Sequence, residues 1–318
     1  EEDGFLLYDL ERDAALFSAY WEAASPDHWF SFFHGQFLPR WKQEKNWGKM
    51  IRLGVWSRNH ESVPASELIE LWIYLIKSYE KELPEIVPAI TFCLHDFSAW
   101  QDPGLRELFT LLLKHVSFIQ PVMLGKPLSK WVESSNDGDD LLWQFITLRV
   151  APKHLDTSLT LLCAEHLFYK KGFLTRRLSQ SENLLSEAID TMEKWSATFG
   201  KPLIDGETRC FFSERTWDSC VRPKERLVSV METLFSAVAY ACDSHAEANS
   251  PWWQKHSSLL WASNELGMRY LCLYALIKNP QSNLNLVKDI IENLPSVING
   301  VFFKSSLPRL LNATSPYL

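Results

Sequence analysis

The residues best suited to chemistry are scattered along this sequence. His34, His95 and His166, together with the acidic residues of 137–140, are the side chains that general acid–base catalysis would use. An all-α enzyme or a small-ligand-binding protein would have to assemble its site from these distant histidines and acids. This is the alternative function that the sequence leaves open.

No recognised motif adds to these candidates. Cys163 and His166 lie one helical turn apart, but a structural zinc ion needs two more ligands. In the acidic loop 134–140, the acidic residues lie directly beside Gly138, and Leu141 follows immediately. This is not the ligand spacing of an EF-hand. G-x-S-x-G, Walker A, G-x-G-x-x-G and H-E-x-x-H are absent. We therefore predict no catalytic residue, no metal and no cofactor, and expect an acid of the loop to cap a helix.

A small basic cluster is the candidate for anion binding. It consists of Lys170, Lys171, Arg176 and Arg177. The two lysines, followed by Gly172, would also suit the C-terminal end of a helix. The net charge of the chain is −7, and no third of the sequence is strongly basic. Nucleic acid is therefore not the expected partner.

Aromatic residues are frequent, with 14 Trp among 318 residues. Two aromatic groups are candidates for protein binding: Trp29, Phe32 and Phe33 near the N-terminus, and the pair Trp252 and Trp253. The alternative is that these large side chains are core anchors, and that the N-terminal group is a packed cap on a helical array.

The stretch 64–119 predicts how such residues would be positioned. Apolar residues recur at intervals of three and four from Leu68 to Tyr79, from Leu83 to Phe97 and from Leu105 to Ile119. This spacing is that of three α-helices with one apolar face each. The links between them are short, which favours antiparallel neighbours, and one such pair cannot bury its own apolar face.

Further helices follow from capping signals and periodicity. Ser179 and Glu182 fit a capping box for a helix that ends at Phe199, and Ser250-Pro251 is a second helix start. One apolar face continues from Leu259 to Ile277. Residues 120–127 should interrupt the pattern before a short helix at 128–133. Residues 201–221 are the least helical, with a small β-hairpin near 203–212 or a long loop.

The predicted fold is all-α, with stacked antiparallel helices in an irregular α-solenoid or a two-lobed helical bundle. We expect an N-terminal lobe over 1–200 with an aromatic-rich cap, an irregular connection over 201–221 and a C-terminal lobe over 222–318. The helix–turn–helix units resemble HEAT and TPR repeats in general style, but the TPR signature residues are absent.

The predicted function is that of a non-enzymatic helical scaffold that binds another protein. The chain begins at Glu1 rather than Met, so we expect a processed chain or a piece of a larger protein. In that case it would be the sensor or regulatory arm of a multidomain signalling protein, with other domains of that chain as partners. Six separated cysteines without a CxxC pair indicate reduced thiols and a cytoplasmic location, and no apolar run is long enough to span a membrane.

Overall fold

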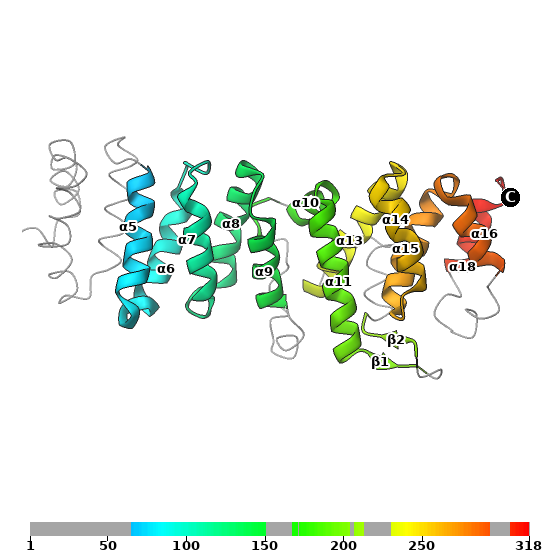
Figure 1. The fold of residues 1–318 in the computed structure, drawn as a ribbon, viewed down its shortest axis with the longest axis horizontal. Helices are drawn as coiled ribbons and strands as arrows, with labels where there is room; N and C mark the ends of the chain where they lie inside the picture. The colour runs from blue at the N-terminus through cyan, green and yellow to red at the C-terminus, as the bar shows by residue number, and fades with distance from the viewer. Residues whose placement is uncertain are drawn as a thin grey trace, which may run out of the picture. The chain divides into compact units, whose positions relative to one another are not determined.

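The computed structural model describes residues 65–150, 167–170, 172–203, 207–212, 230–292 and 306–317. These residues are mostly helical, with twelve α-helices and one two-stranded sheet in the described ranges (Figure 1). The all-α fold is thus confirmed. The predicted aromatic-rich cap, with Trp29, Phe32, Phe33 and His34, lies outside the described residues, as does His166.

Contacts divide the chain into two compact units. The first includes the described residues 65–145 and 167–169, and the second includes the rest of the described chain from residue 146 onward. This grouping differs from the expected lobes, which were to meet at 201–221. Residues 201–203 and 207–212 instead lie inside the second unit, because their contacts are with helices of that unit.

The first unit is built from stacked helices. They are α5 (Ala65–Ser78), α6 (Leu83–Cys93), α7 (Gly104–Lys114), α8 (Pro121–Ser135) and the first part of α9 (Asp139–Val150), whose residues from 146 onward are grouped with the second unit. α5 packs on α6 and on α7, and α6 packs on α8. α5 therefore contacts both its neighbour in sequence and the second helix after it, and α6 contacts the second helix after it. Such stacking lets one helix pair cover the apolar face that the next pair cannot bury alone.

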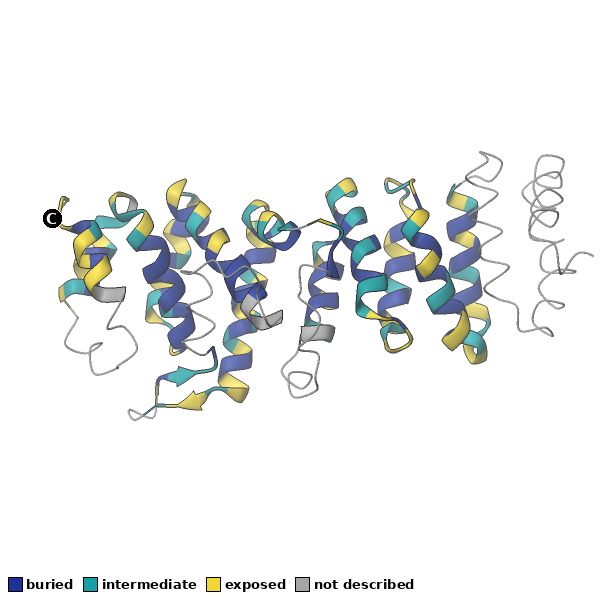
Figure 2. Cartoon of the chain, turned by 180° about the vertical axis from the view of Figure 1, so that it is seen from behind, coloured by how far each residue is buried: buried dark blue, intermediate teal, exposed yellow. Residues whose placement is uncertain are grey.

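The predicted apolar faces are the buried ones. In α5, Leu68, Leu71, Trp72 and Leu75 are at most 1% exposed. Figure 2 shows the same division into buried and exposed sides on the other helices of the unit. Short 3₁₀ turns at Glu80–Glu82, Leu94–Asp96 and Val116–Phe118 connect the helices or extend their ends.

The predicted interruption at 120–127 is wrong. α8 is continuous from Pro121 to Ser135 and holds Pro127 in its interior. Pro121 at the helix start loses no hydrogen bond, and Pro127 is itself buried with Leu124 and Leu128. Burial of this apolar face compensates for the backbone hydrogen bond that Pro127 cannot donate.

The second unit contains the remaining described elements. They are α10 (Phe173–Gln180), α11 (Glu182–Phe199), β1 (Lys201–Pro202), β2 (Arg209–Cys210), α13 (Val230–Glu247), α14 (Pro251–Ala262), α15 (Leu266–Lys278), α16 (Leu284–Glu292) and α18 (Ser306–Thr314). A 3₁₀ turn, η9 (Pro280–Asn283), joins α15 to α16. α13 packs against α10 and α15, and α15 packs against α14 and α18. The core of this unit is therefore centred on α13 and α15.

The predicted hairpin is present, two residues earlier than expected. β1 and β2 are antiparallel, with Lys201 opposite Cys210 and Pro202 opposite Arg209. β1 follows directly from the end of α11 (Figure 1). β2 is also hydrogen-bonded on the side away from β1, where the Arg209 N–H donates to the Asn264 carbonyl at 2.7 Å.

Two local predictions in this unit need correction. The cap of α11 is Ser181, whose hydroxyl accepts from the Leu184 N–H, whereas the Ser179 hydroxyl donates to the Thr175 carbonyl within α10. The predicted continuous face from Leu259 to Ile277 is broken, since α14 ends at Ala262 and α15 begins at Leu266. The capped start at Ser250 is confirmed, because its hydroxyl accepts from the Trp253 N–H.

Candidate functional site

The tryptophan pair predicted to bind a protein is buried. Trp252 is 3% exposed and Trp253 is fully buried. Trp252 stacks on the ring of His256 at 4.6 Å, and its indole N–H donates to the Ser186 hydroxyl. The hydrogen bond to Ser186 joins α14 to α11, and both tryptophans are buried as core anchors, the alternative that the sequence left open.

The basic cluster is only partly described. Lys170 and Arg176 are exposed, Arg177 is half-buried, and Lys171 lies outside the described residues. Gly172, which was expected to end a helix, has φ +69° and precedes the first residue of α10. Each of the three described basic residues takes part in an interaction within the protein. Their charge alone points to no ligand.

The histidine and acidic candidates for an enzyme have structural partners in the first unit. The His95 ring lies 3.1 Å from the Met123 carbonyl, and burial is the main reason that its pKa is lowered. The Arg106 guanidinium donates to Asp137 and Asp140, both at 2.7 Å. The acidic loop is therefore held against α7 by one arginine.

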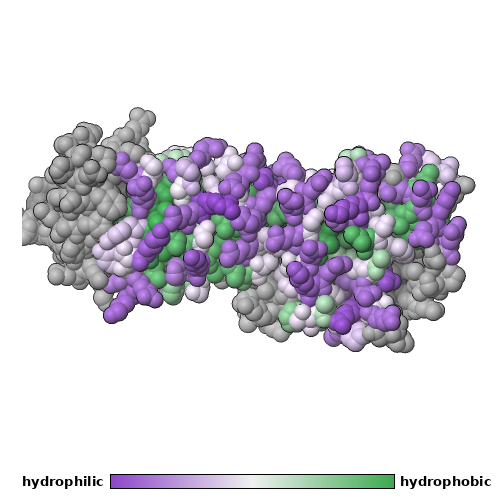
Figure 3. Space-filling view, viewed as in Figure 1, coloured by the Kyte–Doolittle hydropathy of each residue, from purple (hydrophilic) through white to green (hydrophobic). Residues whose placement is uncertain are grey.

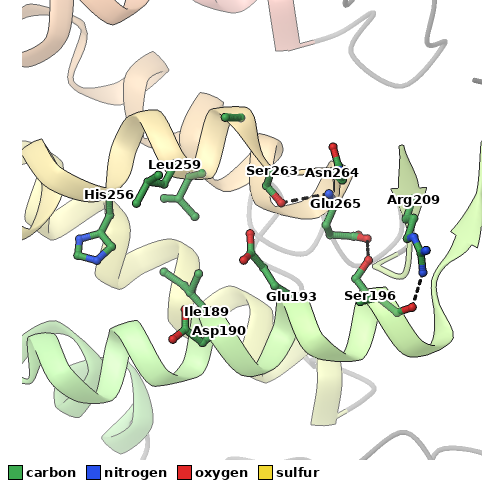
Figure 4. A pocket seen from close by; sticks show the side chains of 13 residues that line it. Ile189, Asp190, Glu193, Ser196, Arg209, His256, Leu259, Ser263, Asn264 and Glu265 are labelled. Carbon is green, nitrogen blue, oxygen red and sulfur yellow. Dashed lines mark hydrogen bonds between the residues drawn. The ribbon is translucent and has the colours of Figure 1, made fainter. Parts of the chain in front are cut away.

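A concave feature with converging polar groups lies in the second unit, between α11 and α14. This groove has a volume of about 570 Å³ and is closed at one end by β2 and the loop from Ser263 to Glu265. Figure 4 shows Glu193 on the α11 side and His256 and Leu259 on the α14 side. We refer to it as the α11–α14 groove.

The walls of the α11–α14 groove combine an apolar side with two acids. Leu259 is 60% exposed, which is unusual for a leucine among buried neighbours. Asp190 is exposed and Glu193 is half-buried, and both lie on α11. In the space-filling view, hydrophobic surface lies between hydrophilic side chains over this part of the second unit (Figure 3).

Arg209 and His256, which also line the groove, have hydrogen-bond partners within the protein. The Arg209 guanidinium donates to the Ala197 carbonyl at the end of α11. His256 directs Nδ1 to the Trp252 carbonyl at 2.7 Å. On α11, the charged groups that a ligand in the groove would meet beside Leu259 are Asp190 and Glu193.

Glu265 forms the buried end of the groove and is 2% exposed. Its carboxylate accepts hydrogen bonds from the Ser196 hydroxyl and from the backbone N–H groups of Phe211, Phe212 and Gly267. One side chain thus ties the end of α11 to β2 and to the start of α15. Figure 4 shows its contact with Ser196.

Two opposing effects act on the pKa of Glu265. Burial raises the pKa because it disfavours the charged form, and the four donors lower it because they favour that form. Burial is the larger effect, so the pKa lies above its ordinary value of 4.5. Both carboxylate oxygens already accept hydrogen bonds, so the group is suited to holding the fold rather than to accepting a proton from a substrate.

Sequence reasoning missed the α11–α14 groove and Glu265. The apolar periodicity from Leu259 to Ile277 masked the turn at Ser263–Glu265. A usable signal was Glu265 itself, the one acidic residue between Glu247 and Asp289. A lone carboxylate in an apolar stretch indicates either a helix start or a buried hydrogen-bonding role, and Glu265 has both.

Among the described residues, no three His, Cys, Asp or Glu side chains gather closely enough to hold a metal ion. No helix in the described ranges is sufficiently long and apolar to cross a membrane. Comparison of the chain with protein families, with curated proteins and with solved structures finds no match.

Proposed function

We propose that this protein is a non-enzymatic helical scaffold that binds a segment of another protein in the α11–α14 groove. The observation that carries the proposal is the exposed Leu259 facing a groove of about 570 Å³ beside the carboxylates of Asp190 and Glu193. The partner segment would place a large apolar side chain against Leu259 and a lysine or arginine near the two acids.

The chemistry of the walls supports this partner. An exposed leucine gains free energy when a ligand covers it, at about 25 cal/mol per Å² of apolar area. Acidic groups on the same wall select for a cation through charge complementarity. An acidic segment would meet like charges, and a purely apolar one would leave the carboxylates without partners.

The proposal extends to regulation and to the cellular compartment. The partner segment could belong to another protein or to another domain of a larger chain, in which case this scaffold is its sensor or regulatory arm. Free thiols at Cys93, Cys210, Cys242 and Cys272 support a reducing compartment, the cytoplasm.

Selection of a displayed library of random dodecapeptides on the full chain tests the proposal. We expect enrichment of sequences in which Lys or Arg lies near a large apolar residue. The double variant Asp190→Asn/Glu193→Gln should weaken a selected peptide about tenfold, since each exposed charge pair contributes up to about 1 kcal/mol. Leu259→Ser should weaken it by a similar factor.

The matched control is Glu187→Gln, an exposed carboxylate on α11 that does not line the groove. This variant should bind the selected peptide as the wild type does. Enrichment of peptides without cations, or equal loss of binding in the control and in the double variant, would refute the proposal.

A further inference from the structure

A second concave site in the second unit is lined by side-chain amides. Its volume is about 600 Å³, and it lies between the start of α14 and the segment formed by η9 and α16. Five primary amides line it, from Asn249, Gln254, Gln281, Asn283 and Asn285. We call it the amide groove. It is separate from the α11–α14 groove, since the two share no lining residue.

The amides of this site have hydrogen-bonding capacity to spare. Gln254 donates through Nε2 to the Asn249 carbonyl at 3.1 Å. The Nδ2 of Asn283 is buried and has no hydrogen-bond partner among the described residues. A buried polar group without a partner destabilises the protein. The Asn283 side chain lines the groove, so rotation of its amide toward an acceptor on a ligand would remove this penalty.

The charges and the lack of aromatic rings among the lining residues limit which class of ligand the groove can bind. Asp289 is the one ionisable lining residue, so an anion would meet no cation and a metal ion would meet a single carboxylate. The lining contains no aromatic ring on which a sugar could stack. The lining therefore suits a neutral ligand whose hydrogen-bond donors and acceptors alternate along its length.

We propose that the amide groove binds the main chain of an extended peptide. A primary amide offers an N–H donor and a carbonyl acceptor side by side, as a peptide group does. Asn and Gln side chains can therefore pair with successive peptide groups without regard to the side chains of the ligand. Leu284 and Leu286, which also line the groove, supply apolar contact beside these polar positions.

The test uses a minimal probe, acetyl-tetra-alanine amide, which has a peptide main chain and almost no side chain. It is titrated into the full chain while the ¹⁵N side-chain signals of Asn and Gln are followed by NMR. We expect the signals of Asn283 and Asn285 to shift with saturation. Acetyl-tetra-sarcosine amide, whose N-methylated backbone has almost no N–H donors, should bind at least fivefold more weakly.

Variants separate recognition from loss of fold. Asn285 is exposed, so Asn285→Ala should leave the protein folded while weakening the probe at least threefold. Gln180→Ala removes an exposed amide at the end of α10, outside the groove, and should change nothing. Equal binding of the sarcosine probe, shifts caused by maltose but not by the alanine probe, or no shift up to the solubility limit of the alanine probe would each overturn the proposal.

Discussion

Replacement of Glu265 by Ala should unfold the second unit more readily than any surface change in it. The substitution leaves the Ser196 hydroxyl and the N–H groups of Phe211, Phe212 and Gly267 without their acceptor in a buried place. Each orphaned donor destabilises by about 1–3 kcal/mol, and water entering the vacated space recovers part of this. We expect a loss of about 4 kcal/mol in the free energy of unfolding.

Glu265→Gln is the conservative counterpart. The amide oxygen of Gln can still accept from the backbone N–H groups, and its NH₂ group can donate to Ser196. The hydrogen bonds lose the reinforcement of a charge, which is worth about 1 kcal/mol each, but the penalty for burying a charge also disappears. We expect a loss of about 1–2 kcal/mol.

The Gln variant also reveals the titration of Glu265. Because the folded-state pKa is raised above 4.5, the native state retains a proton that the unfolded state releases. The stabilising contribution is fully present below 4.5 and is lost as the pH rises through the raised pKa. Gln does not titrate, so the difference in stability between wild type and Glu265→Gln should be larger at about pH 5 than at about pH 8.

Urea unfolding followed by tryptophan fluorescence measures these differences, and hydrogen exchange localises them. Protection of the Phe211, Phe212 and Gly267 amides should fall in Glu265→Ala. Glu193→Ala, which removes a half-buried carboxylate from the same groove, is the control and should lose less than about 1 kcal/mol. If Glu265→Ala stays within about 1 kcal/mol of the wild type, or the control falls equally, the assigned role of Glu265 is incorrect.

Three further outcomes are expected. Gly138→Ala should lower the Tm of the first unit by about 5 °C or more by calorimetry, because Gly138 has φ +85° and a Cβ would lie 2.3 Å from the Trp131 ring. Arg106→Ala should lose about 0.5–1 kcal/mol in urea unfolding at low salt and less at high salt, since its ion pairs are about half exposed. Cys272 is fully buried and its pKa is raised by burial, so mass spectrometry should find it unmodified by iodoacetamide until the second unit unfolds.

Much of the helical fold was predictable from the sequence. The stripes at 68–79, 83–97 and 105–119 identified the first three described helices and the sides that they bury. The cap at Ser250 and the hairpin after Phe199 were also predicted within a few residues. These features are local: apolar periodicity, an N-cap oxygen and a turn depend on residues a few positions apart.

Predictions failed where a distant contact outweighed the local preference. Pro127 stays inside a helix because its neighbours Leu124 and Leu128 are buried in the first unit. Trp252 and Trp253 are core residues because α14 packs against α15 and contacts α11 through Ser186. Sequence spacing could not distinguish an exposed tryptophan from a buried one, since both suit the same helix.

By itself, the sequence determined the helix class, the apolar faces and the absence of catalytic motifs. Only the tertiary structure decided which polar residues meet. Glu265 accepts from residues 54 and 69 positions away in the chain, and the amide groove joins residues near 250 to residues near 285. Helical periodicity indicates which side of a helix is buried, but the packing of the helices determines which residues that side contacts. The two grooves therefore became visible only in the folded chain.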